Sequence, residues 1–68
     1  MIINFKNKII NIEEIKYAII ARYAGNNYQI LISFKNGGDI RIGYDSEGEA
    51  EQGMKQLFEL IDNKQIKQ

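Results

Sequence analysis

The sequence predicts an α+β domain in which an antiparallel sheet of four to five strands is covered on one face by a single C-terminal helix. Three observations support this fold. Apolar and polar residues alternate along three segments between residues 16 and 45, and turns rich in glycine and asparagine separate those segments. An apolar stripe at helical spacing follows in residues 46–63. The chain of 68 residues is long enough for one small domain, residues 1–68.

The first 15 residues are expected to form an N-terminal strand or hairpin and then a corner. Two short apolar runs, residues 2–5 and 8–12, fit either a hairpin or a single bent strand. Asn11 is followed three residues later by Glu14, which is a capping-box pattern and predicts one helical turn. We expect this turn to reverse the chain into the central strands.

The three strands of residues 16–45 are expected to pair in order as a meander. A two-residue loop at Gly25-Asn26 would set Tyr23 opposite Tyr28, because glycine supplies the positive φ that such a loop needs. A three-residue loop, residues 36–38, is expected at the second turn, since it keeps the apolar residues on one face. The residues expected on that face, beneath the helix, are Tyr17, Ile19, Ala21, Tyr23, Tyr28, Ile30, Ile32, Phe34, Ile40, Ile42 and Tyr44.

A helix is expected over residues 46–63, followed by a frayed tail over residues 64–68. Ser46 and Glu49 form a second capping box at its start. Gly53 borders the apolar stripe, which predicts a close approach to a strand. The stripe itself comprises Ala50, Met54, Leu57, Phe58 and Ile61.

The opposite sheet face is the predicted binding surface. In the register above, both arginines of the chain flank a small apolar centre, and two polar side chains add hydrogen-bonding groups. Arginine pairs well with phosphate or carboxylate, so this face could bind a small anion or a protein; alternatively, it is a homodimer contact. The predicted binding residues are Arg22, Arg41, Gln29, Ser33, Ile20 and Leu31.

Composition argues against catalysis. The chain has no histidine and no cysteine, so the commonest general acid–base group and the thiol nucleophile are both missing. The two serines are accounted for: Ser46 caps a helix, and Ser33 lies in a strand with no histidine to activate it. The carboxylates gather at helix starts rather than at metal-ligand spacing. We therefore expect no enzyme activity, no catalytic residues, no metal and no cofactor.

The expected partners are a second copy of the chain and a target protein or small anionic ligand. A domain this small without disulfides gains stability from oligomerisation, so a homo-oligomer is expected. Nucleic acid is less favoured, because the net charge is zero and Tyr23, Tyr28 and Tyr44 are expected under the helix. A third possibility is a structural role in which an edge strand adds to a partner sheet.

The sequence contains no apolar run near the roughly 18 residues of a membrane span, and its first residues lack a signal-peptide pattern. No membrane association is expected, and a cytoplasmic location is the default.

An Ile-Asn-x-x-x-Ile corner precedes the meander, and a Gly-Tyr-x-Ser motif precedes the acidic start of the helix; the residues are Ile10, Asn11, Ile15, Gly43, Tyr44 and Ser46. In this order of elements the chain resembles a broad group of small, uncharacterised bacterial and phage proteins. The resemblance implies a phage or mobile-element accessory factor that acts by stoichiometric binding. It would either block a host defence protein or sequester a nucleotide-like anion.

Overall fold

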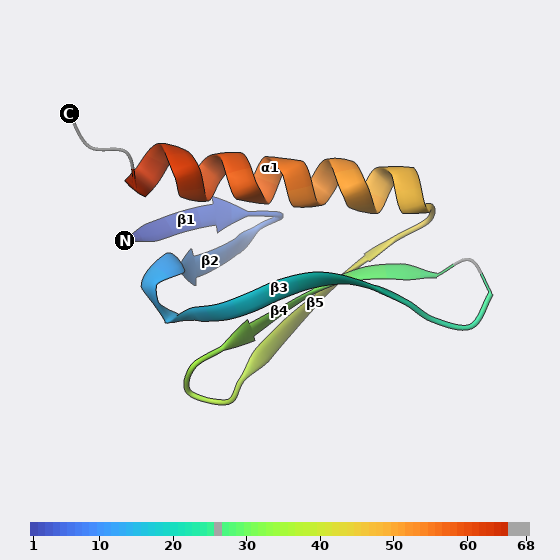
Figure 1. Ribbon diagram of the computed structural model, residues 1–68, viewed down its shortest axis with the longest axis horizontal. Coiled ribbons are helices and arrows are strands. Elements are labelled where there is room, and N and C mark those ends of the chain that lie inside the picture. The colour runs from blue at the N-terminus through green and yellow to red at the C-terminus, as the bar shows by residue number, and fades with distance from the viewer. Residues whose placement is uncertain (26, 66–68) are drawn as a thin grey trace.

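The structure is a computed structural model that describes residues 1–25 and 27–65 (Figure 1). A β-hairpin and a short 3₁₀ turn precede a three-stranded meander, and one long helix lies across the top. In chain order the elements are β1 (Ile2–Phe5), β2 (Lys8–Asn11), η1 (Ile12–Glu14), β3 (Ile15–Arg22), β4 (Tyr28–Phe34), β5 (Asp39–Tyr44) and α1 (Glu47–Gln65). The α+β class with an antiparallel sheet and one C-terminal helix is confirmed. The single sheet of four to five strands is wrong, because β1-β2 and β3-β4-β5 form separate sheets.

The N-terminal segment is a hairpin rather than a bent strand. Its two-residue loop holds Lys6 at φ 53° and Asn7 at φ 65°, the pair of positive φ values that a type I′ turn requires. Because inward and outward residues alternate along both strands, the hairpin buries Ile3, Phe5 and Ile10. It therefore packs its inner face on the core instead of extending the main sheet edge to edge.

The expected corner is present and explains why the sheets separate. The Asn11 side chain accepts a hydrogen bond of 3.1 Å from the Glu13 amide and caps η1. The Glu14 carbonyl then accepts a hydrogen bond of 2.8 Å from the Lys35 amide, which fixes η1 at the end of β4. Consequently the chain changes direction between β2 and β3, and the hairpin cannot pair with the meander.

The pairing of β4 with β5 keeps the predicted faces but not the predicted partners. The Phe34 amide donates to the Gly38 carbonyl at 2.9 Å, and Ser33 lies opposite Asp39. The loop is therefore residues 35–37, with Gly37 at φ 100° in the left-handed region. The register differs from the expected one by two residues, and a shift of two leaves every side chain on its expected face.

The pairing of β3 with β4 differs by one residue, and every expected face in β3 is therefore wrong. The Tyr23 amide donates to the Asn27 carbonyl at 2.8 Å, so residues 24–26 form a three-residue loop; the conformation predicted for Asn26 lies outside the described residues. Ile20 lies opposite Ile30 beneath the helix. The outward residues are instead Tyr17, Ile19, Ala21 and Tyr23.

A β-bulge in β3 allows Ile15 and Ile20 to face the same side of the sheet. The register shifts between Ile15 and Tyr17, so the bulge falls at Lys16. Ile15 and Ile20 differ in parity and would face opposite sides of a regular strand, but the extra residue lets both pack on the core.

The core lies between α1, the hairpin and the inner face of the meander. Ile30 and Ile32 at the centre of β4 are fully buried, and Leu57 of α1 packs in the same cluster at 1% exposure. Burial of side chains of this size contributes about 1.5–3 kcal/mol each. Phe58 was expected in this core but is 66% exposed, because the apolar stripe of α1 is wider than the surface beneath it.

Both ends of α1 can be compared with the predicted start and end of the helix. The Ser46 hydroxyl accepts a hydrogen bond of 3.2 Å from the Glu49 amide, which confirms the cap. At the other end α1 continues to Gln65, so the predicted end at residue 63 is two residues early. The rest of the predicted tail, residues 66–68, lies outside the described residues.

Gly53 confirms the predicted close approach. It is buried in α1 directly above the Tyr44 ring of β5, and a Cβ atom built on Gly53 would lie 2.7 Å from Tyr44 Cζ. No side chain larger than hydrogen fits there unless the ring moves. Gly53 thus sets how closely α1 approaches β5.

Candidate functional site on the open sheet face

The meander has one face beneath α1 and one face that α1 does not cover, which we call the open face. Its residues follow from the observed register and the alternation of side chains along each strand. They are Tyr17, Ile19, Ala21 and Tyr23 from β3 and its end, Gln29, Leu31 and Ser33 from β4, and Asp39, Arg41 and Gly43 from β5.

The open face presents large apolar side chains to solvent. Tyr17 is 46% exposed, Ile19 45% and Tyr23 39%. Ile19 lies opposite Leu31, which is half-buried, and Leu31 lies opposite Arg41. An aliphatic pair at the centre, flanked along β3 by two tyrosines, forms an exposed apolar patch of the kind that marks an interaction surface.

Arg41 is the cation of this face. Its Nη1 donates to the Tyr23 hydroxyl at 3.5 Å, and its Nη2 lies 3.9 Å from Asp39 Oδ2. Both side chains of that ion pair are about half exposed, and exposed ion pairs contribute only about 0–1 kcal/mol. The guanidinium can therefore exchange Asp39 for a ligand at little cost.

The predicted binding residues divide between the two faces. Arg41, Gln29, Ser33 and Leu31 lie on the open face. Ile20 and Arg22 lie on the opposite face, because the one-residue shift inverts β3. Ile20 packs against the core, and Arg22 places its Cζ 5.9 Å from the centroid of the Tyr28 ring. The structure therefore does not bring the two arginines together around one anion.

Two details shape the part of the open face near β5. Gln29 is half-buried, and its Oε1 is enclosed without a hydrogen-bond partner among the described residues. Gly43 lies directly opposite Gln29, and a Cβ atom built on it meets nothing within 4 Å. A side chain attached at position 43 would therefore extend from the open face into open space.

The sequence prediction missed Tyr17, Ile19 and Tyr23 as surface residues. The relevant signal was the adjacent pair Ile19-Ile20, which shows that both sides of β3 carry a large apolar residue. When both sides of a strand are apolar, periodicity alone does not determine which side faces the core.

Other kinds of site find no support in the described residues. No three acidic side chains in residues 1–25 and 27–65 converge closely enough to hold a metal ion. Over the same ranges, no helical stretch combines the length and apolar character needed to cross a bilayer. Comparison with protein-family models, curated proteins and solved structures gives no match to this chain.

Proposed function

We propose that the protein is a small, non-enzymatic binding protein that engages a target protein through its open face. The observation that carries this proposal is the exposure of Tyr17, Ile19 and Tyr23 on one face of the sheet, which also carries Arg41. Tyrosine and arginine are enriched among residues that dominate protein–protein binding energy. The side chains come from strands of a rigid sheet, so little ordering entropy is lost when a partner binds.

The resemblance to small phage proteins suggests the kind of target. A chain of 68 residues that binds stoichiometrically acts by covering a surface of a larger protein, which fits the blocking of a host defence protein. Sequestration of a small anion has less support, since Arg22 and Arg41 lie on opposite faces and cannot bind one anion together.

A photo-crosslinking experiment tests the open face. Gly43 accepts a benzoylphenylalanine side chain because nothing lies within 4 Å of its Cβ. The same group at Ile9, which is 76% exposed on the hairpin, is the matched control. In the producing cell we expect a crosslinked product of defined mass from position 43 and none from position 9.

Two further substitutions in the protein that carries the crosslinker at position 43 test whether the product depends on the open face. Adding Ile19→Ser with Arg41→Glu should abolish the product while the melting temperature stays within a few degrees, since exposed substitutions change stability by about 0.5 kcal/mol or less. Equal crosslinking from positions 43 and 9, or crosslinking unaffected by the double substitution, would show that another surface binds.

Single-stranded nucleic acid is a second candidate, and the observed register favours it more than the sequence did. Tyr17 and Tyr23 are on the open face and could stack bases, with Arg41 available for a phosphate. The zero net charge and Asp39 oppose it. Fluorescence anisotropy of a labelled oligonucleotide decides the matter: salt-dependent binding that Tyr17→Leu weakens would select nucleic acid over a protein target.

A further inference from the structure

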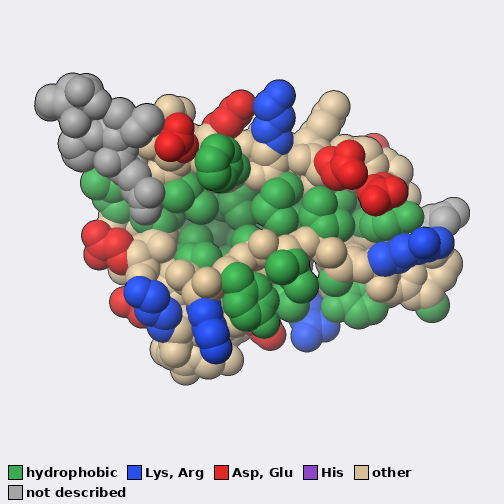
Figure 2. Space-filling model, in the orientation of Figure 1, with side chains coloured by type: hydrophobic (Ala, Val, Ile, Leu, Met, Phe, Trp, Pro, Cys, Tyr) green, Lys and Arg blue, Asp and Glu red, His purple; other side chains and the backbone are tan. Residues whose placement is uncertain are grey.

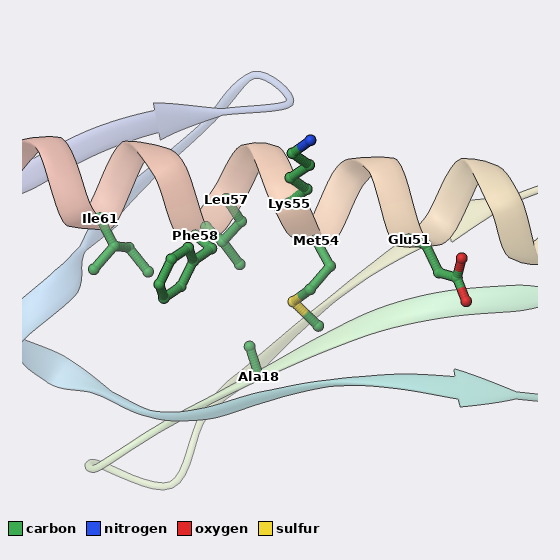
Figure 3. Close-up of a pocket in the computed structure, with 7 residues that line it drawn as sticks. All are labelled: Ala18, Glu51, Met54, Lys55, Leu57, Phe58 and Ile61. Carbon is green, nitrogen blue, oxygen red and sulfur yellow. The ribbon is translucent and has the colours of Figure 1, made fainter.

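An apolar groove runs between α1 and β3, on the side of the molecule that the hairpin does not cover. Figure 2 shows a band of hydrophobic side chains along this side, hollowed between the helix and the strand. The groove has a volume of about 480 Å³. In Figure 3, Met54, Leu57, Phe58 and Ile61 point from α1 toward β3, Ala18 points up at them, and Lys55 points away.

The strand beside the groove has an unpaired edge. β3 is the first strand of the order β3-β4-β5, so one of its sides faces away from the sheet. The Tyr23 amide bonds to β4, and hydrogen-bonded positions recur every second residue in an antiparallel ladder. The backbone N–H and C=O groups of Ala18, Ile20 and Arg22 therefore point to the outer edge. Such a row is a template for another strand.

We propose that β3 pairs antiparallel with β3 of a second copy, about a two-fold axis at Ile20. The pairing would join two three-stranded sheets into one of six strands and close the groove between two helices. It supplies partners for the outward backbone groups of both strands at once. A two-fold contact of this kind is self-complementary and stops at the dimer.

The charges along β3 suit this register. With Ile20 opposite itself, Arg22 lies opposite Ala18 of the partner subunit, and no two like charges face each other. Centring the axis on Ile19 instead would bring Arg22 opposite Lys16 of the partner subunit. The bulge at Lys16 ends regular pairing there, which confines the contact to residues 17–23, symmetric about Ile20.

The spacing of the layers also suits a second copy. In a six-stranded sheet the two β4 strands would be three strand spacings apart, about 14 Å. α1 contacts β4 more extensively than it contacts β3 or β5, so the two helices would stand at about that distance. Helices in direct contact are about 8–10 Å apart. Phe58, 66% exposed, and the half-buried Met54 extend from each helix into the remaining gap.

The dimer uses the backbone edge of β3 and the groove on its α1 side, whereas the proposed function uses side chains on the open face, where Tyr17, Ile19 and Tyr23 would lie beside the dimer contact. The groove is on the α1 side, whereas Arg41 and Gly43 are on the open face and on β5, away from the β3 edge. Dimerisation would place two open faces in one continuous surface. Ala18→Lys therefore tests the dimer, and Arg41→Glu tests target binding without touching the dimer contact.

Charge substitutions at Ala18 test the register. We expect native mass spectrometry and sedimentation to show twice the chain mass of 7.9 kDa. Ala18→Lys places a lysine opposite Arg22 of the partner subunit twice per dimer and should weaken dimerisation at least about tenfold. Ala18→Glu, which introduces a charge at the same position, should retain the dimer. Arg22→Glu added to Ala18→Lys should restore it.

Amide hydrogen exchange tests the edge directly. The amides of Ala18, Ile20 and Arg22 should gain protection as protein concentration rises, whereas those of Tyr17, Ile19 and Ala21 should be protected at every concentration. A chain that stays monomeric at millimolar concentration would overturn the proposal. So would a dimer in which Ala18, Ile20 and Arg22 exchange freely, or one that is indifferent to Ala18→Lys; both would assign the contact to another surface.

Discussion

The two flanks of α1 are built differently. Toward β5, Gly53 lets the helix approach Tyr44 closely, and the hairpin loop closes over that ring, with Lys6 Nζ 5.4 Å from its centroid. Leu60 packs against the core on the same flank as the hairpin. Toward β3, Met54 and Phe58 stand over a groove that the described part of the chain leaves uncovered.

The difference indicates which part of the chain holds the fold and which part is available to a partner. The β5 flank is filled by the chain's own residues, because the hairpin packs on the core and does not pair with the main sheet. The β3 flank retains apolar surface that residues 1–25 and 27–65 do not bury. One side of the apolar stripe of α1 therefore packs on the core, and the other side is available for the proposed dimer contact.

The largest expected effect comes from making the same substitution on both flanks. Phe5 in the hairpin is 3% exposed, and Phe58 is 66% exposed. Phe5→Ala should cost about 3–5 kcal/mol of unfolding free energy, as deletion of a buried phenyl ring does. Phe58→Ala should cost the monomer less than about 1 kcal/mol and chiefly weaken dimerisation. Urea denaturation of each variant at low protein concentration measures the two changes in unfolding free energy.

A small domain has only about 5 kcal/mol of unfolding free energy in total, so Phe5→Ala leaves little folded protein if its cost reaches the upper end of that range. Phe5→Leu keeps most of the volume and gives a measurable transition. Equal losses from the two alanine variants at low concentration would mean that the flanks do not differ as described.

A smaller effect, with opposite signs, is expected at two glycines of α1. Gly53→Ala should destabilise by about 1–3 kcal/mol, since the new methyl group forces the Tyr44 ring to move. Gly48→Ala has nothing within 4 Å of the added Cβ and should stabilise by up to about 1 kcal/mol through helix propensity. Thermal unfolding of both variants measures the difference.

The double variant Gly53→Ala with Tyr44→Leu locates the cause. Removing the ring should make the cost of the alanine much smaller, which a double-mutant cycle reports as coupling between the two sites. If Gly53→Ala stabilised the protein as Gly48→Ala does, the close approach of α1 to β5 would be disproved.

The sequence predicted an element correctly where several local features of that element agreed. Ser46 and Asn11 were identified as caps because a polar side chain, its spacing and the following apolar residues agree. The inner face of β5 was predicted because Ile40 and Ile42 alternate with polar or small residues, and that of β4 because its alternation from Tyr28 to Phe34 is interrupted at only one position, Leu31. Repeated local signals of this kind keep the predicted faces correct despite a register error of two residues.

β3 failed because its signals conflict. Ile19 and Ile20 are adjacent, and each could serve the core, so facing was decided by the length of one loop and by a bulge at Lys16. Neither the loop length nor the bulge can be recognised in the neighbouring sequence. Ile15 pairs with Phe34 and packs on the core, so the strand needs one extra residue at Lys16 for Ile20 to face the core as well. The candidate site inherited this error, gaining three apolar residues and losing Ile20 and Arg22.

The smallest expected effect concerns Tyr44, whose hydroxyl is buried without a hydrogen-bond partner among the described residues. Tyr44→Phe removes that unsatisfied group and keeps the ring beneath Gly53 and Lys6. We expect a gain of up to about 1 kcal/mol in unfolding free energy at neutral pH. Tyr17→Phe, on the exposed open face, is the control and should change the unfolding free energy by a few tenths of a kcal/mol at most.

Burial also raises the pKa of Tyr44 above its ordinary value of 10.0. Above pH 10 the unfolded chain then releases this proton more readily than the folded chain, so the folded state binds more protons and stability falls as pH rises. The loss should be smaller in Tyr44→Phe and unchanged in Tyr17→Phe. Urea denaturation between pH 8 and pH 11 measures the slopes, about 1.4 kcal/mol per pH unit at most for one proton. Identical slopes in all three proteins would place the Tyr44 hydroxyl in water, and the β5 flank would then be no better sealed than the β3 flank.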